Sequence, residues 1–247
     1  MSDGADRLTE RLNEAARDRS FPNLRPRDAA TLILLDRSAD EPKVLLGRRH
    51  DGHKFMPGKF VFPGGRVEPL DRRMTSATPL DARIEHRLMQ RMQRPSREKA
   101  RALALAAIRE TFEETGLLIG MRRNDMPAAP HGPWSAFVTA HVHPDLGSVH
   151  FIGRAITPPG RPRRFDTRFF AADAQTIAER IDGVVGPDAE LVELVWLPIS
   201  EAGRLDMPAI TTTMLAELEA RIAVGMSHDP PVPFYHWTSG HFVREML

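Results

Sequence analysis

The chain contains no cysteine among its 247 residues, which excludes disulfide bonds, thiolate metal ligands and cysteine nucleophiles. Any metal site would therefore use carboxylates, histidines, carbonyl groups and water, and oxygen-rich sites of this kind favour Mg²⁺, Mn²⁺ or Ca²⁺. A charge excess is missing as well, because 34 Lys and Arg face 33 Asp and Glu, for a formal net charge of +1. This balance gives no global argument for binding to nucleic acid or to a membrane surface.

Long apolar runs are also absent. No stretch approaches the roughly 18 consecutive apolar residues that would span a membrane, and residues 1–20 are charged, without the apolar core of a secretory signal. We therefore expect no membrane partner and a cytoplasmic location. The chain is otherwise ordinary, with 41% hydrophobic and 27% charged residues, and it is long enough to bury a sizeable core.

The hydrophobic pattern mixes short strands with a few helices, which predicts an α/β (α+β) layered fold. The clearest helix is expected at 99–115, with Gly116 suited to end it. Strands are expected at 29–35, 43–48, 59–62, 137–143, 150–156, 166–172 and 191–197. Further helical segments are expected at 80–92, 175–180 and 211–224.

The predicted helix at 99–115 carries three glutamates at its end. Glu110, Glu113 and Glu114 fall within about 100° of one helix face, while Leu105 and Ile108 lie on the opposite face. Like charges spaced this way destabilise a bare helix, and a divalent cation would relieve their repulsion. The plainer alternative is a solvated acidic face, which is common on helices.

A second motif favours the metal site over the solvated acidic face. The sequence Val-Phe-Pro-Gly-Gly at 61–65 ends a predicted strand in a turn whose glycines permit close backbone approach. Together the two motifs resemble the Nudix box, whose family pattern is G-x5-E-x7-R-E-U-x-E-E-x-G-U, with U a bulky apolar residue. The positions that follow the pattern are Gly65, Arg109, Glu110, Glu113, Glu114, Gly116 and Leu117.

The box departs from the family pattern at three places. Asp71 stands where the family has glutamate, and Thr111 occupies an apolar slot beside Phe112. In addition, 37 residues (72–108) separate Asp71 from Arg109, where the family has seven. We therefore divide the chain into an N-terminal extension (1–28), a single domain (29–228) with an Arg-rich insert at about 72–99, and a C-terminal tail (229–247).

The resemblance implies a Nudix-type α/β/α sandwich with a mixed sheet and the Nudix helix packed against it. It also implies metal-dependent hydrolysis of a pyrophosphate bond in a nucleoside diphosphate derivative, with Mg²⁺ or Mn²⁺ as cofactor. Carried over from the family, Glu110, Glu113 and Glu114 would bind the metal, and Asp71 would be a supporting carboxylate. Arg109 would orient the glutamates.

The general base has three candidates in this resemblance. Glu110 lies in the box, whereas Glu190 and Glu193 precede or begin a late strand, a region that supplies the base in some family members. For the last two, ordinary surface charge at a strand edge is the alternative.

The stretch at 45–65 partly resembles a signature of coenzyme A diphosphatases within the family, L-L-T-x-R-S-x3-R-x3-G-x-V-x-F-P-G-G. Arg49 matches an arginine of this signature, and Lys54 stands at the second one. Arg49, Lys54, Gly64 and Gly65 are therefore the candidate substrate-binding residues. Coenzyme A or acyl-CoA ranks first among the substrates, with ADP-ribose, nucleotide sugars and dinucleoside polyphosphates as alternatives.

Two other classes of function stay open. A non-catalytic, nucleotide-sensing Nudix-like module would keep the fold, although all three box glutamates are present. The Arg-rich insert suggests nucleic-acid binding, which the near-neutral net charge does not support. The expected partner is thus a small nucleoside diphosphate derivative, and a homodimer is an open alternative.

Overall fold

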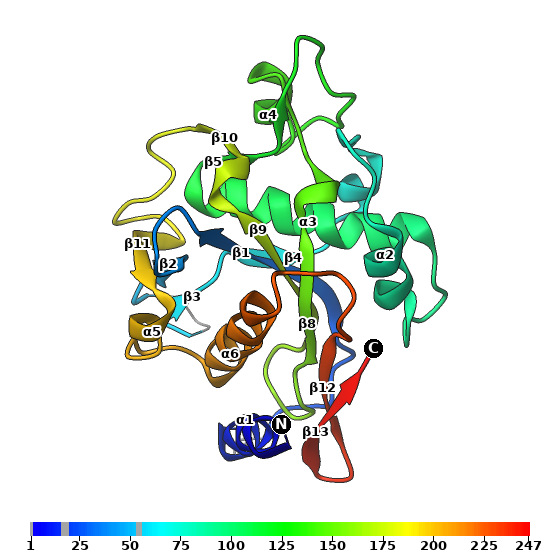
Figure 1. Cartoon of the computed structure of the whole chain (residues 1–247), viewed down its shortest axis with the longest axis vertical. Coiled ribbons are helices and arrows are strands. Elements are labelled where there is room, and N and C mark those ends of the chain that lie inside the picture. The colour runs from blue at the N-terminus through cyan, green and yellow to red at the C-terminus, as the bar shows by residue number, and fades with distance from the viewer. Residues whose placement is uncertain (1, 16–19, 53–55) are drawn as a thin grey trace.

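A mixed sheet forms the centre of the structure, a computed structural model that describes residues 2–15, 20–52 and 56–247 (Figure 1). Nine strands of the described residues belong to it. Seven of them follow in spatial order: β11 (Leu191–Pro198), β2 (Lys43–Arg49), β1 (Arg27–Asp36), β9 (Phe165–Asp173), β8 (His150–Ile156), β12 (Pro233–Thr238) and β13 (His241–Met246). The two short strands β3 (Phe60–Val61) and β4 (Gly64–Arg66) pair with β2 and β1. The β1–β9 and β8–β12 pairs are parallel and the other pairs are antiparallel.

Strand β1 shows why the sheet is buried on both sides. Successive side chains of a strand point to opposite faces, and this strand is apolar at nearly every position from Ala29 to Leu35. Leu32 and Leu34 belong to the core cluster of one face, whereas Ile33 and Leu35 belong to that of the other. Both faces of the sheet must therefore be covered.

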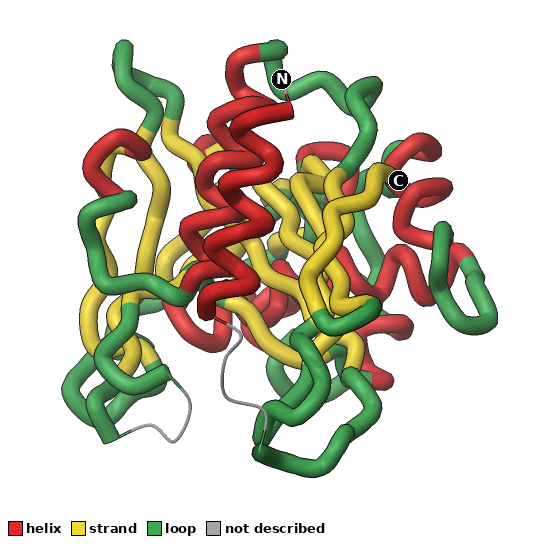
Figure 2. Tube along the Cα trace, turned by 90° about the horizontal axis from the view of Figure 1, so that it is seen from below, coloured by secondary structure: helices red, strands yellow, loops and turns green. Residues whose placement is uncertain are grey.

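Helices cover the two faces in separate groups. The Leu32 face packs against α2 (Ala82–Met89) and α3 (Arg97–Thr115). The opposite face packs against α1 (Ser2–Ala15), α5 (Ile199–Ala202) and α6 (Ala209–Ala223). Figure 2 shows the helix that begins at the N-terminus lying against the strands. The expected α/β/α sandwich with a mixed sheet is confirmed.

Smaller elements complete the fold around this sandwich. Strand β5 (Leu117–Ile119) pairs with β10 (Ile177–Arg180), and β6 (Met121–Arg122) pairs with β7 (Val142–His143). The remaining helices are α4 (Ser135–Thr139) and the 3₁₀ turns η1 (Pro69–Arg73), η2 (Leu146–Ser148) and η3 (Ala174–Thr176). Among the described residues, no helix is long and apolar enough to cross a membrane.

Helix α3 begins and ends at residues suited to those positions. The side chain of Ser96 accepts a hydrogen bond from the Lys99 amide at 3.2 Å, an N-cap that satisfies one of the free amides of the first turn. Gly116 ends the helix with φ of 75°, a backbone conformation that glycine adopts at little cost. The prediction of this helix and of its terminal glycine is confirmed.

Two predicted elements differ in the structure. Residues 137–143 were expected to form one strand, but Phe137 lies in α4, His141 adopts a turn conformation with φ of 54°, and only Val142 and His143 are in a strand. Phe137 is buried against Trp134 and Phe112, with ring centroids 5.0 and 5.6 Å away. Tertiary packing of a short apolar segment thus decides its conformation. The segment 175–180 begins as η3 but continues as strand β10 rather than as a helix.

The residues of the expected C-terminal tail form β12 and β13, and β12 pairs directly with β8 of the main sheet. The aromatic residues of this tail therefore pack as part of the fold. The division of the chain into an extension, a domain and a tail stays a prediction.

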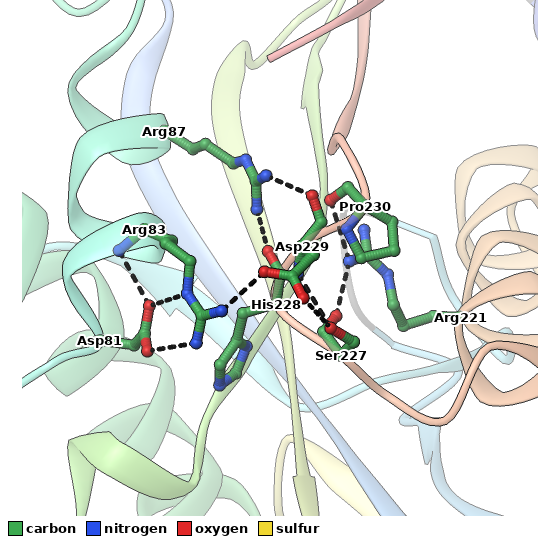
Figure 3. Close-up of polar contacts among 8 residues, drawn as sticks. All are labelled: Asp81, Arg83, Arg87, Arg221, Ser227, His228, Asp229 and Pro230. Atoms are coloured by element: carbon green, nitrogen blue, oxygen red, sulfur yellow. Dashed lines mark hydrogen bonds and ion pairs between the residues drawn. The ribbon is translucent and has the colours of Figure 1, made fainter.

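The insert is anchored on the loop that leads into this hairpin (Figure 3). Arg87 of α2 donates hydrogen bonds to the carbonyls of His228 and Asp229, the second at 2.7 Å. From the other side, Arg221 of α6 donates to the carbonyls of Ser227 and of two following prolines. Two guanidinium groups thus bind the 227–231 backbone between the two helical layers.

The Arg87 contacts predict a stability effect that a neighbouring arginine should not share. Arg87→Gln removes charge-assisted hydrogen bonds to two carbonyls, and we expect the free energy of unfolding to fall by about 1–3 kcal/mol. Urea unfolding measures this change. Arg83→Gln is the matched control, because Arg83 forms exposed ion pairs with Asp81 and Asp229 that should contribute little. Equal losses for both variants would contradict this account of the anchor.

Candidate active site

Helix α3 meets the Pro-Gly-Gly turn through Glu114. This side chain is only 6% exposed, and its Oε2 accepts a hydrogen bond from the Gly64 amide at 3.1 Å. Burial raises the pKa of Glu114 well above its ordinary value, and the nearby carboxylates of Glu190 and Glu110 raise it further. The end of α3 therefore holds a carboxylate in a place where negative charge is costly.

Glu110 lies against the second glycine of the turn. Strand β4 pairs with β1, with Gly65 opposite Ala30, and this pairing brings the turn backbone up to α3. A methyl group on Gly65 would lie 2.5 Å from Cδ of Glu110, so glycine leaves room for the Glu110 carboxylate in its present position. Burial raises the pKa of Glu110 to about 7, although the Arg109 guanidinium opposes this shift.

Arg109 is the centre of the polar network. Its side chain is 2% exposed and donates to both oxygens of Asp71, at 2.7 and 3.1 Å. Its Nη1 also donates to Glu110 at 2.8 Å and to Glu113 at 2.5 Å. Its Nη2, which donates to Asp71 Oδ2, also donates to the Arg66 carbonyl at 2.8 Å. A single guanidinium thus contacts two of the three box glutamates, and its role in orienting them for catalysis stays a prediction.

Asp71 completes this network from the start of the insert. It is fully buried in η1, where its Oδ2 also accepts the Glu68 amide at 2.8 Å. Both oxygens are engaged with Arg109, an arrangement that suits a positioning residue. A direct role of Asp71 as a metal ligand stays a prediction.

A second arginine faces the cluster from β2. Arg49 Nη2 forms an ion pair with Glu190 at 2.9 Å, and its charge also acts on Glu114. The Nε of Arg49 is buried and has no hydrogen-bond partner among the described residues. Glu193 instead forms a 3.4 Å ion pair with Arg48 and is half exposed. The two late glutamates thus pair with different arginines, and the charge of Glu190 acts on Glu114.

The sequence pattern named Arg49 and Glu190 separately but did not predict their pairing. That contact follows from strand order, because β11 pairs with β2 so that Leu191 lies opposite Arg49. The Arg66 carbonyl was also missed, since backbone acceptors leave no signal in residue type. Lys54 lies outside the described residues.

The carboxylates of the cluster are bonded to other groups of the protein. Among the described residues, no group of three or more acidic or histidine side chains is gathered closely enough to hold a metal ion. The contacts above supply the reason: Arg109 bridges Glu110 and Glu113, while Glu114 faces Gly64.

The chemistry of the donors nevertheless fits a hard cation. Five carboxyl groups meet two guanidinium groups here, a formal excess of three acidic groups. The carboxylates are those of Asp71, Glu110, Glu113, Glu114 and Glu190, and the guanidinium groups are those of Arg49 and Arg109. Oxygen ligands with excess negative charge are what Mg²⁺ and Mn²⁺ require.

Comparison with solved structures identifies a similar protein of known family. A Nudix hydrolase from Alicyclobacillus acidocaldarius is 33% identical, with a TM-score of 0.58, and the match covers 79% of this chain and 92% of that one. No protein-family model matches the chain.

Two curated proteins are also similar over part of their length. The human acyl-coenzyme A diphosphatase NUDT19 is 27% identical over 211 residues, which cover 65% of this chain and 54% of that protein. A nudix hydrolase protein of Caenorhabditis elegans is 28% identical over 156 residues, or 58% of this chain and 43% of that protein. The matches thus span about half the length of these curated relatives.

We expect alanine substitution to reduce stability more at Gly64 than at Gly65. In Gly64→Ala the new Cβ would meet backbone atoms, 2.6 Å from the Ala30 carbonyl oxygen, so we expect a loss of about 1–3 kcal/mol in the free energy of unfolding. In Gly65→Ala the new Cβ meets only the carboxylate end of Glu110, which can rotate away. Thermal and urea unfolding should therefore show Gly65→Ala as the more stable variant, and the reverse order would refute this close approach of turn and helix.

Proposed function

The chain belongs to the Nudix hydrolase family, whose members hydrolyse pyrophosphate bonds, and from this premise we propose that it cleaves coenzyme A or an acyl-CoA with the help of Mg²⁺ or Mn²⁺. The observation that carries the proposal is the excess of carboxylates between α3 and the Pro-Gly-Gly turn. Such a cluster is costly in an apoprotein and is stabilised when a divalent cation binds.

Glu110, Glu113 and Glu114 would hold the metal in this proposal. When bound, the metal would supply charge neutralisation on the phosphate oxygens and on the leaving group. The protein's own contribution is orientation, because Arg109 holds Glu110 and Glu113 while the Gly64 amide holds Glu114. These bonds must rearrange on metal binding, since Arg109 now bridges two of the ligands.

We assign the general base to Glu190. A glutamate that holds a cation is a poor acceptor for the proton of the attacking water, which argues against the three box glutamates. Glu190 stands beside Glu114 and is held by Arg49 at 2.9 Å. Glu193 is turned to Arg48.

The substrate proposal rests on Arg49 and on the similarity to NUDT19. Arg49 occupies the arginine position of the coenzyme A diphosphatase signature, and its buried Nε lacks a hydrogen-bond partner among the described residues. A phosphate oxygen of the substrate would satisfy that donor. The human relative acts as an acyl-coenzyme A diphosphatase, and it shares 27% identity with this chain. Cytoplasmic location and dimer formation stay predictions.

A substrate screen tests this assignment. The purified protein is incubated with Mg²⁺ or Mn²⁺ and with CoA, acyl-CoA, ADP-ribose, NADH, nucleotide sugars or dinucleoside polyphosphates, and the products are separated by chromatography. We expect CoA or acyl-CoA to be cleaved fastest. Glu113→Gln and Glu114→Gln should each lower kcat by about 100-fold or more, because each removes charge needed to bind the cation.

The possible failures of the screen are distinguishable. Faster cleavage of another compound would refute the CoA assignment and leave the hydrolase intact. Tight metal-dependent binding of a nucleotide without turnover would instead identify a non-catalytic, nucleotide-sensing module. A chelator control separates metal-dependent cleavage from contaminating activity.

The assignment of the base has its own matched pair of variants. Glu190→Gln should lower kcat by about 10²–10⁴-fold and remove the acidic limb of the pH–rate profile, because the neutral amide cannot accept a proton. Glu193→Gln should change kcat by less than about threefold, since it removes only an exposed ion pair. Comparable small effects in both variants would exclude Glu190 and return the role to Glu110.

A further inference from the structure

A cavity of about 340 Å³ lies further along the main sheet from the carboxylate cluster, where β8 and β12 run side by side. Its volume falls within the range of about 300–1,000 Å³ that is typical of small-molecule sites. Three arginines and three aromatic side chains contribute to its wall: Arg91, Arg154, Arg164, Phe234, His236 and Trp237.

Segments far apart in the sequence build this cavity together. Arg91 follows the insert helix α2, Arg164 lies in the loop between β8 and β9, and Phe234 comes from the C-terminal hairpin. The parallel register places Phe234 directly opposite Arg154. Arg154 also donates to the Gln90 carbonyl at 3.0 Å, which ties the insert to the sheet at this point. The insert and the C-terminal hairpin therefore contribute to the same cavity wall.

The charges of the wall are not fully balanced. Arg154 is paired with Asp166, at 2.8 and 2.7 Å, and Arg91 is paired with Glu245 at 2.6 Å. Arg164 has no carboxylate partner among the described residues and donates only to neutral oxygens, including the Thr157 carbonyl at 3.0 Å. Burial lowers the pKa of Arg164, which reflects the cost of removing this cation from water. A bound anion would offset that cost.

The same wall presents a series of flat groups. The Arg154 guanidinium lies 4.4 Å from the centre of the Phe234 ring, and the His236 ring lies 4.7 Å from it at an interplanar angle of 30°. Phe234 and Arg154 are buried, whereas His236 and Trp237 are partly exposed and line the cavity, so a further aromatic ring would stack on these two side chains. Stacking surface and unbalanced positive charge therefore occur in one cavity.

We propose that this cavity binds a planar aromatic ring that carries a phosphate group, which is the chemistry of a nucleoside monophosphate, at a site separate from the carboxylate cluster. Arg164 and Arg91 bind the phosphate, and the ring stacks on His236 and Trp237, with Phe234 and Arg154 packed behind His236. The two sites are separated by the strands β1, β9 and β8, so a ligand here does not reach the box glutamates.

Calorimetric titration with AMP in the presence of a chelator tests this proposal. AMP has no pyrophosphate bond, and the chelator removes the cations that the proposed hydrolysis requires, so neither turnover nor its failure affects the measurement. We expect saturable binding of one AMP per chain. Adenosine and inorganic phosphate should each bind at least about tenfold more weakly, because each makes only half of the contacts.

Substitutions in the cavity wall test whether AMP binds in this cavity. Arg91→Gln and Arg164→Gln should each weaken AMP binding by about tenfold or more. Arg163→Gln is the matched control, because Arg163 is exposed in the same loop but does not line the cavity. Glu113→Gln, in the other site, should also bind AMP normally. Because Arg164 supports the fold through its carbonyl contacts, unfolding is measured in parallel, and the exposed Arg91 provides the second, independent variant.

Three results would overturn the proposal. The first is the absence of AMP binding at millimolar concentration. The second is binding that Arg91→Gln and Arg164→Gln leave unchanged. The third is tighter binding of single-stranded oligonucleotides, with affinity that rises with length and falls steeply with salt, which would identify a nucleic-acid surface instead.

Discussion

The buried guanidinium of Arg109 is the interaction on which the rest of the site depends. A charge with 2% exposure is tolerated only when its donors are satisfied, and this group bonds to two carboxylates of its own helix, to Asp71 and to the Arg66 carbonyl. These partners come from α3, from η1 and from β4. The same bonds that satisfy the charge therefore hold the helix, the turn and the start of the insert in one arrangement.

This network explains how the two halves of the box stay together although 37 residues separate Asp71 from Arg109. Hydrogen bonds of Arg109 join the two halves of the box and do not depend on their distance in the sequence. The chain can therefore form a long segment between the end of η1 and Ser96, where α3 begins. The inserted segment then needs its own anchors. Arg87 supplies one on the 227–231 loop, and the Gln90 carbonyl supplies another on Arg154 of β8. The insert thereby joins the box to the C-terminal hairpin.

The sequence predicted those features that depend on local pattern. Helix α3, its terminal Gly116 and the buried strand β1 follow from periodicity and from the backbone freedom of glycine, and all three are observed. The prediction of a strand at 137–143 was wrong, because a short apolar segment also suits a short helix that packs on the core. Pairings between distant segments, such as Arg49 with Glu190, depend on strand order, and no single segment carries that information.

The amino-acid composition also could not predict how charge is distributed over the sheet. A net charge of +1 suggests an electrostatically plain molecule, yet excess carboxylates gather near β4 and an unbalanced arginine lies beyond β8. Between them, ion pairs link Asp28 to Arg168, Arg168 to Asp166 and Asp166 to Arg154. The two ends are separated by roughly 15–20 Å of strand spacing, which exceeds the screening length of about 10 Å at 0.1 M salt. Each end of the sheet therefore has its own electrostatic potential. A ligand that binds at one end responds to the local excess of charge there rather than to the net charge of the protein.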